Sequence, residues 1–352
     1  MRLTRLAVPG VTLGVLVAAL AGCGGGANSI FNPSQPSQPS QPSSGATPPA
    51  ETVFVSDAIG VASSDTGPDV IDVFNSHISN GGNFSAQITY SKMTTAYNIA
   101  AFGGNIYVSN MGPAPGPAIF VFPKTANGAT SPTRTISGPA SQLTAPAGIA
   151  VDNSGNIYVA DPNGGPTNSG QVDIYAPGSN VPQRTLGGQL SGLSQPDAVA
   201  VDSQGDVFVA NDAGGSVSGT GSLREFAPGA GYNTAPIFVY GSNGVLNGPT
   251  AVTLDDVGNI LVACDQSNQI VEFAPNTTSP IGSLSPNNGI SQPQGLVADS
   301  SGFLYVVNLT SSLSGSGPNI SVYASGVSQP VIVYGGQSGS QSTFVAPSGI
   351  AL

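Results

Sequence analysis

A repeated pattern constrains this chain more than any other feature of its sequence. The clearest copy reads PAGIAVDNSGNIYVAD from Pro146 to Asp161, and changed copies begin at Pro196, Pro249 and Pro293. In each copy, two runs rich in β-branched, aromatic and small apolar residues flank a turn with an early Asp and a late Gly, here Asp152 and Gly155. This arrangement predicts a β-hairpin. Two further runs follow each hairpin, and four antiparallel strands in roughly 45 to 55 residues are typical of a propeller blade.

The two ends of the repetitive region complete one further unit between them. Thr52–Asp57 matches a second strand without a first, whereas Pro347–Leu352 matches a first strand without a second. A degenerate copy lies at Ala96–Asn110, and its turn lacks the Asp. The total is five continuous units and one split unit. We therefore predict an all-β fold, a six-bladed propeller of four-stranded antiparallel blades, closed by pairing the C-terminal strand with the N-terminal blade.

The first strand of each unit is unusually small, as the segments GIAV, AVAV, AVTL and GLVA illustrate. Small side chains fit where the innermost strands of a propeller converge near a central channel. Ordinary packing in the core is an alternative explanation for the same pattern.

The start of the chain has the features of a targeting segment. In residues 1–22, Arg2 and Arg5 precede an apolar run, Val8 to Leu20, that is too short for a stable membrane span and is typical of a secretory signal peptide. The sequence LAGC, which ends at Cys23, closely resembles the lipobox of bacterial lipoproteins. The resemblance implies cleavage before Cys23 and its lipidation, and two or three acyl chains anchor a protein stably. A plain secretory peptide with an accidental Cys is the alternative.

A tether is expected between the anchor and the propeller. Residues 23–50 begin with the lipidated Cys and contain Ser-Gln-Pro triplets from Ser34 to Pro42, so they have little to bury and are predicted to be disordered. The propeller domain is assigned to residues 51–352. The anchor predicts a cell-envelope location. Gly24 follows the Cys where an Asp would resemble an inner-membrane retention signal, which favours the outer membrane or the cell surface.

Charge restricts the partners. Without Arg2 and Arg5, five basic residues stand against eighteen acidic ones, a net charge near −13 (5 − 18). This balance argues against a nucleic-acid partner and against adhesion to anionic lipid by charge. Cys264 is the only cysteine after Cys23, so it has no partner for an intrachain disulfide and is expected to be a small buried apolar residue.

The unit PxGIAVDxxGNIYVAD, followed by a third strand with an aromatic residue, resembles the NHL repeat. The resemblance covers essentially all of residues 51–352 and implies a six-bladed propeller of the kind found in many bacterial surface proteins. The Asn-His-Leu segment that names the repeat is missing, and the nearest stretch, after Asp265, reads QSNQI. Similar propellers include binding modules, lactonases and lyases, so the fold does not assign a function. His77 is the only histidine, which leaves no His cluster for the zinc site of related amidating lyases.

A polar residue ends each predicted second strand and is a candidate ligand. These residues are Asp57, Asn110, Asp161, Asn211, Asp265 and Asn308. In a closed ring they would lie at one level on one face, and their oxygens suit calcium or another hard cation. The alternative function, drawn from the resemblance to lactonases of the gluconolactonase and paraoxonase type, is a lactonase-like hydrolase that depends on calcium or a similar metal held by this Asp/Asn ring. The alternative is that each Asp or Asn caps the turn that follows it.

Long variable loops follow these positions and are rich in Gly, Ser and Pro. They are Ala58 to Asp69, Met111 to Pro117, Pro162 to Gly170, Asp212 to Gly221 and Leu309 to Pro318. Variable loops gathered on one face of a rigid scaffold are the usual place for recognition. The leading prediction is a non-enzymatic, monomeric, lipid-anchored propeller that binds an envelope protein or glycan through this face. A purely structural role is a third possibility.

Overall fold

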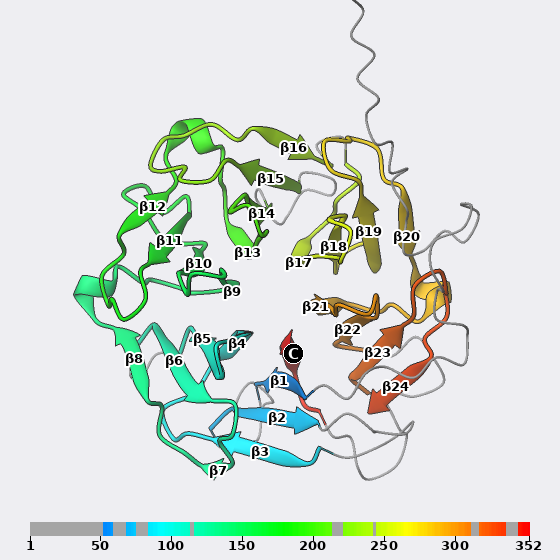
Figure 1. Cartoon of the computed structure of the whole chain (residues 1–352), viewed down its shortest axis with the longest axis horizontal. Coiled ribbons are helices and arrows are strands. Elements are labelled where there is room, and N and C mark those ends of the chain that lie inside the picture. The colour runs from blue at the N-terminus through cyan, green and yellow to red at the C-terminus, as the bar shows by residue number, and fades with distance from the viewer. Residues whose placement is uncertain are drawn as a thin grey trace, which may run out of the picture.

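The computed structural model describes residues 52–58, 68–74, 84–112, 116–212, 221–241, 244–310, 317–335 and 344–352. These residues form six sheets around a central axis, each with its first strand innermost and its fourth strand at the rim (Figure 1). The predicted six-bladed propeller is therefore confirmed. We name the blades A to F, where blade A is the one that contains both ends of the described chain.

The strands take the same four places in every blade. The first strands of blades A to F are β25 (Pro347–Ala351), β4 (Ala96–Phe102), β9 (Ile149–Val151), β13 (Pro196–Val201), β17 (Pro249–Leu254) and β21 (Pro293–Ala298). The second strands are β1 (Val53–Asp57), β5 (Asn105–Asn110), β10 (Ile157–Asp161), β14 (Val207–Asn211), β18 (Ile260–Cys264) and β22 (Leu304–Asn308). The third strands are β2 (Val70–Phe74), β6 (Ala118–Pro123), β11 (Gln171–Tyr175), β15 (Ser222–Phe226), β19 (Gln269–Phe273) and β23 (Asn319–Tyr323). The fourth strands are β3 (Ala86–Thr89), β8 (Arg134–Ser137), β12 (Arg184–Leu186), β16 (Phe238–Tyr240), β20 (Gly282–Leu284) and β24 (Ile332–Gly335).

Some short elements were not predicted from the sequence. β7 (Gly128–Ala129) adds a parallel fifth strand to the rim of blade A, next to β3. Three 3-10 turns lie in the links between blades: η2 (Pro139–Ser141), η3 (Gln189–Ser191) and η4 (Pro286–Asn288). These elements are too short to produce a hydrophobic period. No helix among the described residues is long and apolar enough to cross a membrane.

The turn between the first and second strands forms as the repeated Asp and Gly predict. Oδ1 of Asp152 accepts hydrogen bonds from the backbone N–H groups of Ser154 and Asn156, both at 2.9 Å. Asp202, Asp255 and Asp299 make the same pair of bonds. Gly155 has φ +81°, a backbone conformation that glycine adopts without strain. The turn therefore depends on local chemistry, which explains why it recurs so regularly.

The ring closes in blade A. β25 pairs antiparallel with β1, with Ala351 opposite Phe54 and Ile350 opposite Val55. This pairing is the predicted one, and it leaves no first strand missing from the ring (Figure 1). Closure also removes the sheet edge that β1 would otherwise present to other chains.

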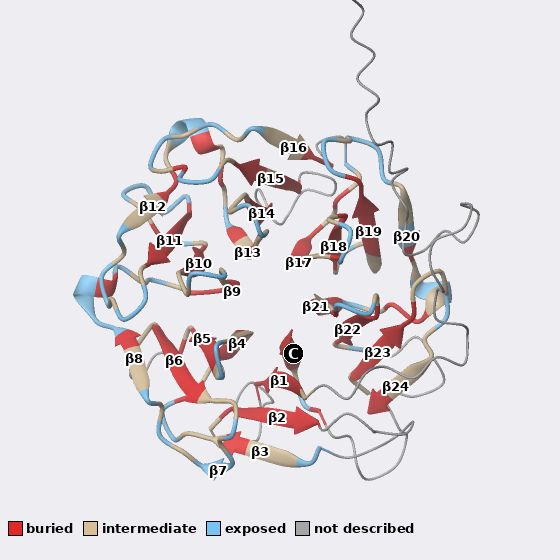
Figure 2. Ribbon diagram, viewed as in Figure 1, coloured by how far each residue is buried: buried red, intermediate tan, exposed pale blue. Residues whose placement is uncertain are grey.

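Aromatic residues at or near the ends of the third strands fill the space between neighbouring blades. They are at most 1% exposed: Phe74, Phe122, Tyr175, Phe226, Phe273 and Tyr323. Phe226 of blade D, for example, belongs to one cluster with Tyr158 of blade C. Full burial of such a side chain contributes about 1.5–3 kcal/mol. The buried second and third strands of Figure 2 show that the core is divided among the blade interfaces.

Candidate functional site

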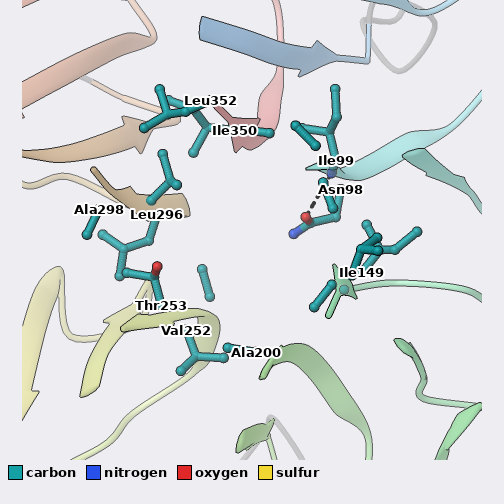
Figure 3. Close-up of a pocket in the computed structure, with 18 of the residues that line it drawn as sticks. Asn98, Ile99, Ile149, Ala200, Val252, Thr253, Leu296, Ala298, Ile350 and Leu352 are labelled. Carbon is teal, nitrogen blue, oxygen red and sulfur yellow. Dashed lines mark hydrogen bonds between the residues drawn. The ribbon is translucent and has the colours of Figure 1, made fainter. Parts of the chain in front are cut away.

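A central channel runs between the six first strands and encloses about 750 Å³ (Figure 3). Ile149, Val252, Leu296 and Ile350 line it together with alanines, and polar side chains such as Asn98 and Thr253 line it as well. The prediction that the small first strands surround a channel is confirmed.

The small residues also allow the first strands to pack closely. A Cβ atom at Gly148 would lie 2.5 Å from Cα of Ala198 in the next blade. At Gly349, a Cβ atom would lie 2.7 Å from Cα of Asn98. Small residues in the first strands therefore serve both to line the channel and to let neighbouring first strands approach closely.

Five of the six candidate ligands bind backbone close to their own blade's first strand. Asp161 is fully buried and accepts hydrogen bonds from the N–H groups of Thr144 at 2.6 Å and Ala145 at 2.9 Å, and from the Thr144 hydroxyl at 2.5 Å. The corresponding backbone donors are Val345 and Ala346 for Asp57, Thr94 and Thr95 for Asn110, Ser194 for Asn211, and Ser291 for Asn308. In these five blades, the hydrogen bonds therefore connect the segment just before the first strand to the end of the second strand.

The prediction that these Asp and Asn residues cap the following turn named the wrong hydrogen-bond partner for five of them. We expected each side chain to cap the turn after it, but its hydrogen bonds go to residues that precede the first strand. The sequence could not reveal this because donor and acceptor are 17 residues apart in blade C and come from opposite ends of the chain in blade A. Each hydrogen bond is worth about 1.5–3 kcal/mol where the acceptor is a charged carboxylate and about 0.5–1.5 kcal/mol where it is a neutral Asn amide, so the contact stabilises every one of these blades.

The predicted calcium ligands do not gather their oxygens around one point. Both carboxylate oxygens of Asp161 accept hydrogen bonds from protein donors, as do both oxygens of Asp57. Among the described residues, no three His, Cys, Asp or Glu side chains are placed to hold a metal ion. The carboxylate oxygens of Asp57 and Asp161 are therefore already used in hydrogen bonds to the protein. Calcium binding stays a prediction, which titration can test.

Asp265, the sixth candidate, lies instead in a cavity of about 320 Å³ beside one mouth of the channel. Asp197 of β13 and Asp212, just after β14, line the same cavity. Tyr97 of β4 donates its hydroxyl to both carboxylate oxygens of Asp197, at 2.9 and 3.0 Å. This contact joins blade B to blade D. Of the described residues that line this mouth pocket, three are carboxylates and none is basic.

Burial and mutual repulsion shift the protonation of these carboxylates. Burial raises the pKa of Asp197, the Tyr97 hydrogen bond opposes that rise, and Asp212 and Asp265 add to it, which gives a pKa of about 7. Burial, followed by the charge of Asp265, also raises the pKa of Asp212. A cation at this mouth would favour the ionised carboxylates and lower their pKa values. The pocket is therefore suited to a positively charged group.

In blades D, E and F, the residue after the proline of the first strand lines this mouth, a signal that the sequence prediction missed. The register of the first and second strands shifts between Pro196 and Ala198, which marks a β-bulge at Asp197. Thr250 and Gln294 occupy the same place in blades E and F, and both line the mouth pocket. Bulges commonly re-aim side chains near functional sites. Variation at this one position, between constant neighbours, could have pointed to the mouth.

The remaining predicted residues have different outcomes. Cys264 is a free, fully buried thiol in β18, as predicted, and burial raises its pKa to about 12. Cys23 and His77 lie outside the described residues, and so do the middle parts of four variable loops. The described loop Pro162–Gly170 follows β10 and contributes Pro162 to the mouth pocket.

Residues 143–172 match the family model of the NHL repeat, and they span β9, β10 and the start of β11. Together with the six blades, this match defines the class of the protein. The chain is a six-bladed β-propeller that carries an NHL repeat.

Two solved structures resemble most of the chain. A protein of unknown function from Bacteroides caccae superposes with a TM-score of 0.60 at 15% identity, over 85% of this chain and 97% of that chain. A chain of a nidogen/laminin complex superposes with a TM-score of 0.58 at 13% identity, over 86% of this chain and 98% of that chain. Likeness at such low identity shows the fold alone. No curated protein matches the chain.

Proposed function

We propose that this propeller is a binding module of the cell envelope, whose protein partner docks at the mouth pocket and the surrounding loops. The observation that carries the proposal is the group of three carboxylates, Asp197, Asp212 and Asp265, in one cavity at the channel mouth. A Lys or Arg side chain of the partner would enter this cavity and neutralise them. Charge complementarity of this kind steers association and selects the partner.

The fold and the position of the pocket support the proposal. NHL propellers often bind proteins, and one similar structure is a nidogen/laminin complex. The second strands of all six blades end at this face, and their connections to the third strands begin there. Loops on a rigid scaffold can vary without disturbing the core, which suits them to recognition.

Site-specific photo-crosslinking of the full chain in cells tests the docking face. We would place a photoreactive amino acid at Gln266, an exposed residue in the mouth pocket. The matched control position is Val257, which is 56% exposed in the turn at the other end of the same blade. The proposal predicts a discrete protein adduct from position 266 and none from 257. The same adduct from both positions, or none from 266, would exclude docking at the mouth.

The anchor is a separate part of the proposal. The LAGC sequence and the signal-peptide features support lipidation of Cys23, followed by a tether that holds the propeller away from the membrane. We expect Cys23→Ser to abolish incorporation of radiolabelled palmitate and to release the protein from the membrane fraction. Unchanged labelling of that variant would refute the anchor without affecting the proposed docking site.

A further inference from the structure

A second cavity, of about 480 Å³, lies on the outer flank of blade C. Gln171 of β11 and Thr185 of β12 form its inner part, and Gln142 and Thr144 border it from the link into the blade. Tyr232 reaches it from the segment between β15 and β16 of blade D. This flank pocket shares no lining residue with the channel or with the mouth pocket. Its size falls within the ~300–1,000 Å³ that is usual for small-ligand sites.

Apart from Pro166 and Tyr232, the side chains around the flank pocket are uncharged hydrogen-bonding groups. Gln142 and Gln171 carry amides, which offer both donors and acceptors, and Thr144 and Thr185 carry hydroxyls. The Thr144 hydroxyl and the Gln171 amide also bond to Asp161 and Asp173 respectively, which fixes their positions. A pocket of this composition discriminates by hydrogen-bond pattern, since it has no charge with which to select an ion.

Tyr232 gives the pocket an aromatic face. Tyr232 is 56% exposed, whereas Tyr158, Tyr175 and Tyr240 are buried. An aromatic ring combines a flat apolar face with, in tyrosine, a polar tip. Such a ring can pack against the C–H face of a sugar while neighbouring amides bond to the sugar hydroxyls.

A buried polar group directly beneath the pocket is left unsatisfied. Asp173 follows Gln171 by two residues in β11, so both side chains lie on the same face of the sheet. Asp173 is also the cross-strand partner of Thr185. It is fully buried, and its Oδ2 has no hydrogen-bond partner among the described residues. Burial and the nearby Asp161 raise the pKa of Asp173 to about 8, so it is mostly an uncharged acid at pH 7. The layer under the pocket is thus polar.

We propose that the flank pocket binds a neutral carbohydrate, with one sugar ring stacked on Tyr232 and its hydroxyls bonded to Gln142, Gln171 and Thr185. A peptide or a charged polysaccharide fits less well, because the pocket has no charged side chain and its apolar lining is limited to Tyr232 and Pro166. Since the site shares no residue with the mouth pocket, sugar binding and protein docking can succeed or fail independently.

Calorimetry and affinity electrophoresis of the full chain test the proposal. The probes are the neutral oligosaccharides maltohexaose, cellohexaose, mannohexaose, xylohexaose and chitohexaose, with polygalacturonate as a charged comparison. We expect at least one neutral probe to bind, and Tyr232→Ala to weaken it at least tenfold. Gln142→Ala, which replaces an exposed residue at the pocket border, should weaken the same probe by severalfold.

Ile237→Ala is the matched control, since Ile237 lies in the same connection between strands and is also 56% exposed but does not line the pocket. Its affinity should equal that of the wild type. The proposal is overturned if no neutral probe binds, if polygalacturonate or only a protein binds in a Tyr232-dependent way, or if Tyr232→Ala and Ile237→Ala behave alike.

Discussion

Asp173 makes the stability of the propeller depend on pH at the scale of a single residue. Its pKa of about 8 in the folded state lies far above its ordinary value of 3.8. Between these pH values the folded state keeps a proton that the unfolded state has released. The free energy of unfolding is therefore not reduced by Asp173 below about pH 4, and it falls as the pH rises toward 8. We expect Asp173→Asn to raise the free energy of unfolding at pH 9 and to change it little at pH 4. Thermal unfolding across this range measures the difference.

Asp152 provides a control of opposite sign. Burial alone would raise its pKa, but hydrogen bonds from Asn156 and Ser154 outweigh that effect and lower the pKa below its ordinary value. Its stabilisation is therefore present above about pH 4 and is lost as pH falls through the folded pKa. Asp152→Asn should remove stability at neutral pH. If both variants shifted the pH profile in the same direction, the assigned protonation of Asp173 would be wrong.

At the scale of the element, each blade depends on the contact between its entry link and its second strand. Asp161→Ala would leave the Thr144 and Ala145 N–H groups without their acceptor, which should cost about 2–4 kcal/mol. Asp161→Asn should cost much less, because blades B, D and F use Asn in the same place with one accepting oxygen. Denaturant midpoints compare the two variants.

The same measurement separates this structural role from calcium binding. If Asp161 holds only backbone, adding calcium leaves the midpoints of the wild type and both variants unchanged. A rise in the wild-type midpoint that both variants lack would show instead that Asp161 is a metal ligand, since a ligand that binds only the folded state stabilises it.

At the scale of the whole molecule, the parts that the sequence predicted are those that depend on local chemistry. Asp152 and Gly155 make their turn within a few residues, so repetition of the pattern revealed the blades. The split blade could be predicted because Thr52–Asp57 matches a second strand without a first, and Pro347–Leu352 matches the missing first strand. The contact of Tyr97 with Asp197 in the mouth pocket could not be predicted, since the fold brings these residues together from one hundred positions apart in the sequence. Asp197 also owes its direction to a bulge, which leaves no mark in the hydrophobic pattern.

The most direct test of the central claim, that the channel mouth binds the partner through its carboxylates, is to neutralise two of them. The variant Asp212→Asn/Asp265→Asn removes two charges from the mouth pocket. The matched control Asp206→Asn/Asp256→Asn removes two charges from the same blades, at the turns on the opposite face. Affinity for the protein crosslinked from position 266 would be measured across ionic strengths. We predict at least a tenfold loss and a weaker salt dependence for the mouth variant alone, whereas equal losses in both variants, or none in either, would contradict the account.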